Sequence, residues 1–161
     1  MLGTNDALTG YIGGDDFADE AFRDAYKSLE RARRGITEGT LTTALNISSI
    51  LCNTGRHSEA RAFSSKRIGE STRLLGPDHD LTLKFRSNYA MAVYKDPNSS
   101  LHDLTSAVET MEKVLRVRRR VFGHCPRTTR EARKTEVARA VLAERHARET
   151  PTDELDEVEN A

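Results

Sequence analysis

The amino-acid sequence predicts an all-α protein, an α-solenoid in which antiparallel helix pairs repeat along the chain. Two observations predict this class. First, sequence elements recur, because Thr82-Leu83 follows Thr40-Leu41 after 42 residues and Asn88 follows Asn46 at the same offset. Second, apolar residues recur at helical spacing between Gly- and Pro-containing breaks. A period of this length is typical of stacked supersecondary units, and 161 residues are enough for one domain.

The first unit contains two predicted helices, at residues 40–53 and 58–68. Apolar or small residues of the first of these helices recur near helical spacing at Leu41, Ala44, Ile47, Ser48 and Leu51. Gly55 follows as a stop signal, and Ser58 is a candidate N-cap of the second helix. On that second helix we expect the inward-facing residues to be Ala60, Phe63 and Ile68.

The second unit repeats the pair at residues 81–94 and 104–122, with five extra residues between its helices. The insertion falls in residues 95–103, where Asp96-Pro97-Asn98 predicts a loop. On the first helix the apolar stripe includes Tyr89, Ala90 and Val93. The second helix carries a stronger stripe, formed by Ala107, Met111, Val114, Leu115 and Val121.

Half-units flank these pairs: a second helix at residues 17–34 and a first helix at residues 128–149. We therefore expect a disordered segment at 1–14, a helical repeat domain at 15–149 and an acidic disordered tail at 150–161. Incomplete pairs leave apolar faces at both ends of the array. The sequence thus predicts marginal stability and self-association through the terminal repeats.

The turn between the units is "LLGPDHDLTL", Leu74 to Leu83. Gly76 suits the positive φ that ends a helix, and Pro77 forbids its continuation. Asp80 or Thr82 is expected to cap the next helix, which makes His79 a turn residue with no catalytic role. Echoes of this turn occur at residues 33–41 and 121–129.

These residues resemble the tetratricopeptide repeats of the kinesin light chain type, whose units are joined by a Leu-Gly-x-x-His-Pro-x-Thr-Leu turn. "LGPDHDLTL" matches that turn except that Asp80 replaces Pro, and "GRHSEA" matches the short turn within a unit. "NIS" at Asn46 and "NYA" at Asn88 stand for the family's Asn-Leu-Ala. The resemblance spans about residues 15–148 and weakens at both ends: the turn at residues 33–41 lacks Pro and His, and Lys134 replaces the Asn expected in the third copy. It implies an α-solenoid whose first helices line a concave groove that binds peptides or proteins, without catalysis.

One face of each first helix is the predicted peptide-binding site. On the helix after Thr82 this face carries Lys84, Asn88, Met91 and Lys95. The equivalent positions in the neighbouring units are Thr42, Asn46, Ser49 and Asn53, and Arg130, Lys134, Val137 and Val141. Asn amides can hydrogen-bond a peptide backbone, and the cations favour an acidic segment. The predicted site is therefore Asn46, Lys84, Asn88, Met91, Arg130, Arg133 and Lys134. The alternative is that these residues only form solvated polar faces.

Charge is distributed unevenly, although the formal net charge is zero. Residues 113–148 hold twelve Lys/Arg and three acids, whereas residues 149–161 hold six acids and no base. The run "RVRRR", Arg116 to Arg120, raises the alternative of a basic nucleic-acid-associated helical protein, but no aromatic residues accompany it. We interpret this run as a solvated outer face. The acidic tail is either merely solubilising or a built-in competitor for the groove, with Leu155 and Val158 as apolar anchors.

Other functional classes lack support in the sequence. No common nucleotide-binding, hydrolase or metalloprotease motif occurs, so we expect no enzyme activity and no cofactor. The His and Cys residues lack paired ligand spacing, so no metal site is predicted. The chain has two cysteines, no apolar run of membrane-spanning length and a mean hydropathy of −0.62. We expect a cytoplasmic protein whose partner is a protein or peptide; a degenerate fragment of a longer repeat protein is the remaining alternative.

Overall fold

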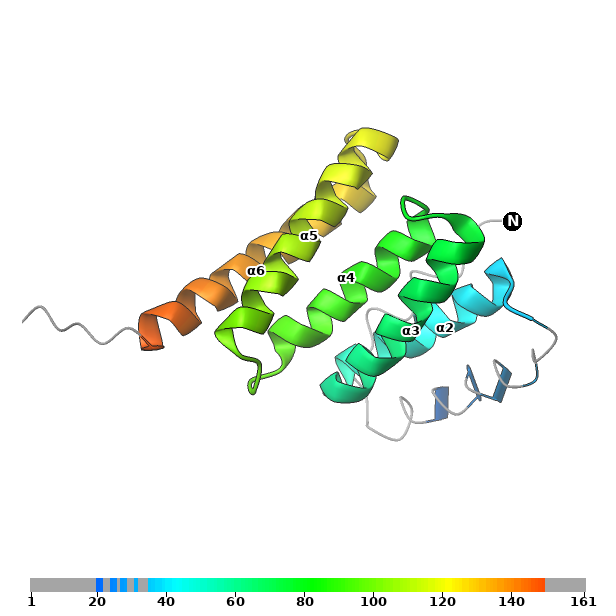
Figure 1. Ribbon diagram of the computed structural model, residues 1–161, viewed down its shortest axis with the longest axis horizontal. Coiled ribbons are helices and arrows are strands. Elements are labelled where there is room, and N and C mark those ends of the chain that lie inside the picture. The colour runs from blue at the N-terminus through cyan, green and yellow to red at the C-terminus, as the bar shows by residue number, and fades with distance from the viewer. Residues whose placement is uncertain (1–19, 22–23, 26, 29–30, 32–34, 150–161) are drawn as a thin grey trace, which may run out of the picture.

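The computed structural model describes residues 35–149, and before them residues 20, 21, 24, 25, 27, 28 and 31. Residues 35–149 form five α-helices and no strand (Figure 1). These helices are α2 (Glu38–Asn53), α3 (His57–Leu75), α4 (Asp80–Lys95), α5 (Leu101–Phe122) and α6 (Pro126–Glu149). The prediction of an all-α solenoid of helix pairs is therefore confirmed.

Helix α4 lies at the centre of the array and packs against each of the other four helices. The first helices of successive units, α2, α4 and α6, contact one another in that order. In Figure 1 the second helices α3 and α5 lie in front of α2 and α6. The three first helices thus share one side of the array, as stacked helix pairs require.

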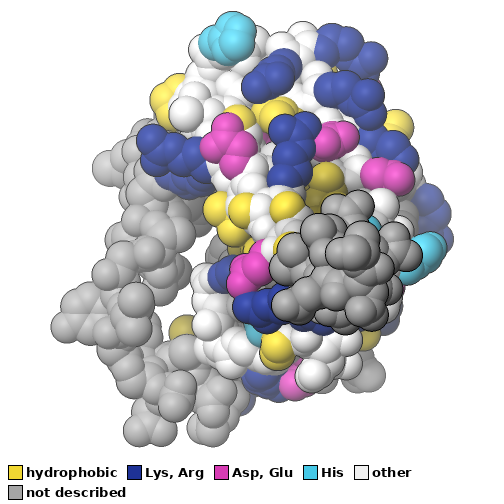
Figure 2. Space-filling view, turned by 90° about the vertical axis from the view of Figure 1, so that its left-hand side faces the viewer, with side chains coloured by type: hydrophobic (Ala, Val, Ile, Leu, Met, Phe, Trp, Pro, Cys, Tyr) yellow, Lys and Arg dark blue, Asp and Glu magenta, His cyan; other side chains and the backbone are white. Residues whose placement is uncertain are grey.

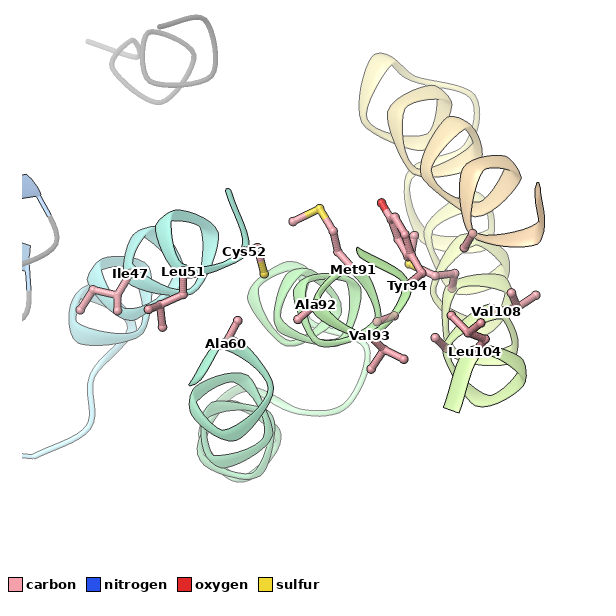
Figure 3. Close-up of a cluster of buried hydrophobic side chains, with 14 residues drawn as sticks. Ile47, Leu51, Cys52, Ala60, Met91, Ala92, Val93, Tyr94, Leu104 and Val108 are labelled. Carbon is pink, nitrogen blue, oxygen red and sulfur yellow. The ribbon is translucent and has the colours of Figure 1, made fainter. Parts of the chain in front are cut away.

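The core follows the helical spacing that the sequence predicted. Leu41, Ala44, Ile47, Ser48 and Leu51 of α2 are all buried, as are Ala107, Met111, Val114 and Leu115 of α5. Figure 3 shows α2, α4 and α5 contributing side chains to one cluster, with Met91 and Tyr94 on one side of α4 and Val93 on the other. A second cluster joins Leu41 and Ala44 to Leu81 and Phe85. Phe63 and Ile68 are half-buried against these clusters.

The prediction that Val121 faces the core is wrong, because its side chain is 50% exposed. The inward position of that turn belongs to Arg118, which is 2% exposed. Three residues later the helix has turned the side chain to the edge of the buried stripe. The equivalent residue of the first unit, Leu74, is exposed for the same reason.

The turn between the units is built as predicted, except for its cap. Gly76 has a φ of 94°, and the Thr82 hydroxyl donates to the Gly76 carbonyl at 2.9 Å. The N-cap of α4 is His79, whose Nδ1 accepts from the Leu81 amide at 3.3 Å, so the prediction of Asp80 or Thr82 as the cap is wrong. An imidazole nitrogen can accept that bond as a carboxylate would.

The other helix starts differ slightly from their predicted positions. Ser58 does not cap α3, because the helix begins one residue earlier and its N-cap, Arg56, makes no side-chain capping bond. Helix α5 begins at Leu101, where Ser100 and Asp103 form a capping box. Polar side chains able to accept amide hydrogens are frequent in this chain, so local sequence did not single out the caps.

Some predictions concern segments that are only partly described. Within the predicted helix at 17–34, the seven described residues are helical. The predicted disordered segments at 1–14 and 150–161 lie outside the described residues. In the part of the chain that the structure describes, no helix is both long and apolar enough to span a membrane.

Candidate functional site

The side of the array formed by α2, α4 and α6 contains the predicted site, and we call it the first-helix face. Among the predicted site residues, Asn46, Arg130 and Arg133 are exposed, and Lys134 is half-buried. Lys84 is half-exposed and pairs with Asp80 at 2.9 Å. The remaining two predicted site residues are buried: Asn88 and Met91.

Asn88 forms part of the contact between α2 and α4. Its amide donates to the Ser48 hydroxyl at 3.2 Å and to the Ser49 hydroxyl at 3.1 Å. The Ser48 hydroxyl also bonds that of Ser64 at 2.7 Å, and the Cys52 thiol donates to the Asn88 carbonyl at 3.4 Å. Both amide hydrogens of Asn88 are therefore used within the array, which fixes the spacing of the first two units.

Lys95 and Lys134 add to the positive charge of the first-helix face. The Lys95 ammonium donates to the Asn53 side-chain oxygen at 3.4 Å. Burial lowers the pKa of Lys134; the nearby Glu131 charge opposes this shift, and the Arg118 and Arg130 charges add to it. Among the described residues, neither lysine has an acidic partner within ion-pair distance. A half-buried ammonium without a carboxylate partner is a favourable place for an anion.

Behind this face, Arg118 forms a buried charge network. Its guanidinium lies 3.1 Å from Asp80 and 3.8 Å from Glu131, and Ser87 donates to Glu131 at 2.6 Å. The interpretation of Arg116–Arg120 as a solvated outer face is therefore wrong for Arg118. The alignment of the repeats could have identified this pair. Arg118 and Glu131 occupy the positions of Ser71 and Phe85 one unit earlier, and those two residues are buried.

A small cleft of about 110 Å³ opens between the carboxyl ends of α4 and α6. Tyr94, Pro97 and Val141 supply its apolar lining. Lys95, Asp96, Glu144, Arg145 and Arg148 supply its charged lining. Arg145 donates to the carbonyls of Ser99 at 3.2 Å and Pro97 at 2.7 Å, and so joins α6 to the loop after α4. Sequence reasoning missed this cleft. Arg145 and its two carbonyl partners are 46 and 48 positions apart in the sequence, and helical spacing does not predict contacts over such separations.

The two thiols differ in their surroundings. Burial raises the pKa of Cys52 to about 11, so this thiol stays protonated at neutral pH. Hydrogen bonding by Thr128, whose hydroxyl donates to the Cys125 sulfur at 3.5 Å, lowers the pKa of Cys125, which precedes α6. The described residues contain no cluster of three or more His, Cys, Asp or Glu that could hold a metal ion.

Comparison with known proteins agrees with the repeat geometry. Residues 40–80, which span α2, α3 and the turn into α4, match the family model described as tetratricopeptide repeat. The match supports a tetratricopeptide repeat protein. Such repeats are generally protein-interaction modules and are typically not enzymes. No curated protein and no solved structure matches the chain.

Proposed function

We propose that this tetratricopeptide repeat protein is a scaffold or adaptor that binds a peptide segment of its partner on the first-helix face. The observation that carries the proposal is the packing of α2 against α4 and of α4 against α6, with Lys95 and Lys134 lacking an acidic partner among the described residues. Three helices of consecutive units offer an extended surface, which suits an extended segment.

The charges of this face favour an acidic partner. Arg130 and Arg133 are exposed beside Lys134, and any carboxylate that reaches Lys134 offsets the cost of its burial. Exposed amides at Asn46 and Asn53 can pair with a peptide backbone through donor and acceptor. The partner that fits best is an extended segment with acidic side chains.

A basic nucleic-acid-associated protein is the competing proposal. Seen from the α5–α6 end, basic and acidic side chains are interspersed and do not gather into one basic patch (Figure 2). Arg118 is also withdrawn into the core and paired. Both observations favour a protein partner over a polyphosphate backbone, which is best met by a continuous basic stripe.

The resemblance to the kinesin light chain type, a cytoplasmic location and self-association through the terminal repeats belong to the same proposal. Cell fractionation tests the location. Analytical ultracentrifugation tests self-association, for which a concentration-dependent mass is expected. A concentration-independent monomer that melts sharply above ~65 °C would contradict both self-association and marginal stability.

A peptide selection tests the function. Random 12-residue peptides displayed against the protein should become enriched in Asp and Glu, and the selected peptides should bind Lys95→Ala/Lys134→Ala at least tenfold more weakly. Arg116→Ala is the matched control, since Arg116 is an exposed cation on α5, away from the first helices. Selection without acidic enrichment, or equal losses in both variants, would contradict the proposal. Tight duplex binding that survives physiological salt would favour the nucleic-acid alternative.

A further inference from the structure

The cleft between α4 and α6 is lined by apolar and charged side chains, and its charged side chains carry an excess of positive charge. Among its acidic side chains, Asp96 is paired with Arg61 at 3.2 Å and Glu144 with Arg148 at 2.5 Å. Neither acid therefore offsets the other two cations of the lining.

Those two cations, Lys95 and Arg145, bond only to neutral oxygens among the described residues. Lys95 donates to an amide oxygen of Asn53, and Arg145 donates to two backbone carbonyls. Charge-assisted bonds to a carboxylate are stronger than bonds to neutral acceptors. The carboxyl ends of α4 and α6 carry partial negative charge, so the attraction for an anion is moderate and sensitive to salt.

The chain itself supplies a segment with the matching chemistry. Residues 150–161, "TPTDELDEVENA", hold five acidic residues and no basic residue. Two aliphatic residues, Leu155 and Val158, lie among these acids. The tail follows directly on α6, whose residue Arg148 lines the cleft. Leu155 is seven positions after Arg148, a length of chain that can span up to ~24 Å, so the apolar residues of the tail can reach the cleft.

We propose that residues 153–158 bind in the cleft, with Leu155 and Val158 on Tyr94 and Val141 and the acids beside Lys95 and Arg145. The cleft lies at the carboxyl end of the first-helix face, so the bound tail competes with an acidic partner. This competition rests on the proposed function, whereas the contact itself does not. A tether this short gives an effective concentration of ~1 mM, so even a tail that binds with a dissociation constant of ~0.3 mM occupies the cleft about three quarters of the time.

Full-length variants test the contact without disturbing the helical array. One variant neutralises the tail by Asp153→Asn, Glu154→Gln, Asp156→Asn and Glu157→Gln. A second removes the apolar contacts by Leu155→Ser and Val158→Ser, and Asn160→Ala is the matched tail control. In two-dimensional NMR spectra we expect both variants, but not the control, to shift the signals of Tyr94, Val141 and Arg145 while those of α3 stay in place. Wild-type protein in 0.5 M NaCl should move toward the neutralised variant.

A synthetic peptide of residues 150–161 completes the test when added to each protein. It should bind both tail variants about fourfold more tightly than the wild type, because the tethered copy no longer competes. Cleft signals that coincide in all proteins, or equal peptide affinities, would overturn the tail contact. If the peptide still binds the face equally well in every protein, the contact fails and the proposed function survives. If a panel of acidic peptides fails to bind any variant, the proposed function fails as well.

Discussion

The buried pair of Arg118 and Glu131 gives the sharpest prediction about stability. Their side chains are 3% and 5% exposed, and they join α5 to α6, whereas the equivalent positions one unit earlier hold Ser71 and Phe85. Removing Arg118 leaves the Glu131 carboxylate as an uncompensated buried charge, which costs about 3–5 kcal/mol in comparable sites. We therefore expect Arg118→Met to lower the free energy of unfolding by about 3 kcal/mol, or the melting temperature by roughly 10 °C. Glu131→Leu should cost only about 1 kcal/mol, because Arg118 keeps Asp80 at 3.1 Å.

The double variant distinguishes this explanation from a simple loss of packing. Asp80 keeps Lys84 at 2.9 Å and Arg127 at 3.7 Å, so no charge is left buried without a partner when both residues become apolar. Arg118→Met/Glu131→Leu should therefore recover to within about 1 kcal/mol of the wild type, an interaction energy of about 3 kcal/mol. Urea titrations followed by circular dichroism measure all four proteins, and Arg116→Met serves as the exposed control. Additive losses in the double variant would refute the reasoning.

Three further predictions follow from named contacts. The pKa of Asp80 is lowered, because its bond to Lys84 and its cationic neighbours outweigh the effect of burial. The stability that Asp80 contributes is therefore present above the unfolded pKa and is lost as the pH falls through the folded pKa. Asp80→Asn should flatten the decline in stability below about pH 4, and an unchanged acid limb of the pH profile would contradict this. Gly76 has a positive φ, whereas Gly69 lies within α3 and has no neighbouring atom that an added Cβ would meet. In denaturant melts, Gly76→Ala should therefore lower the free energy of unfolding by about 1 kcal/mol, and Gly69→Ala should raise it by about 0.5–1 kcal/mol. Changes of the same sign in both variants would contradict these backbone assignments. Asn88→Ala leaves buried hydroxyls without their donor and should lower the free energy of unfolding by about 1–3 kcal/mol. The exposed control Asn46→Ala should change it by less than about 0.5 kcal/mol, and equal losses in the two variants would contradict the buried role of Asn88.

The fold could be predicted from the sequence because its signals are local and repeated. Helical spacing identified the buried residues of α2, and the recurrence of "TL" after 42 residues placed the units in register. The Gly76 turn was predictable because few residues other than Gly tolerate a positive φ. These signals need no knowledge of which helices touch.

The tertiary contacts of charged residues could not be predicted in this way. Arg118 sits within a run of arginines, and only its rotation on α5 turns it toward Glu131 and away from solvent. Arg145 bonds two carbonyls of a loop that is distant in sequence. Asn88 was predicted on a polar face, and its predicted peptide contact is untested; its buried bonds to Ser48 depend on how closely α2 and α4 approach.

Mapping a bound acidic peptide tests the central claim most directly. A peptide enriched by the selection is added to isotope-labelled protein, and amide shifts and hydrogen exchange are followed along helices α2 to α6. The proposal predicts that shifts and protection concentrate on α2, α4 and α6, with Ser49, Met91 and Lys134 among the affected residues, and that the outer side of α5 around Arg116 is unaffected. Shifts that concentrate on α5, or no change at saturating peptide, would contradict binding at the first-helix face.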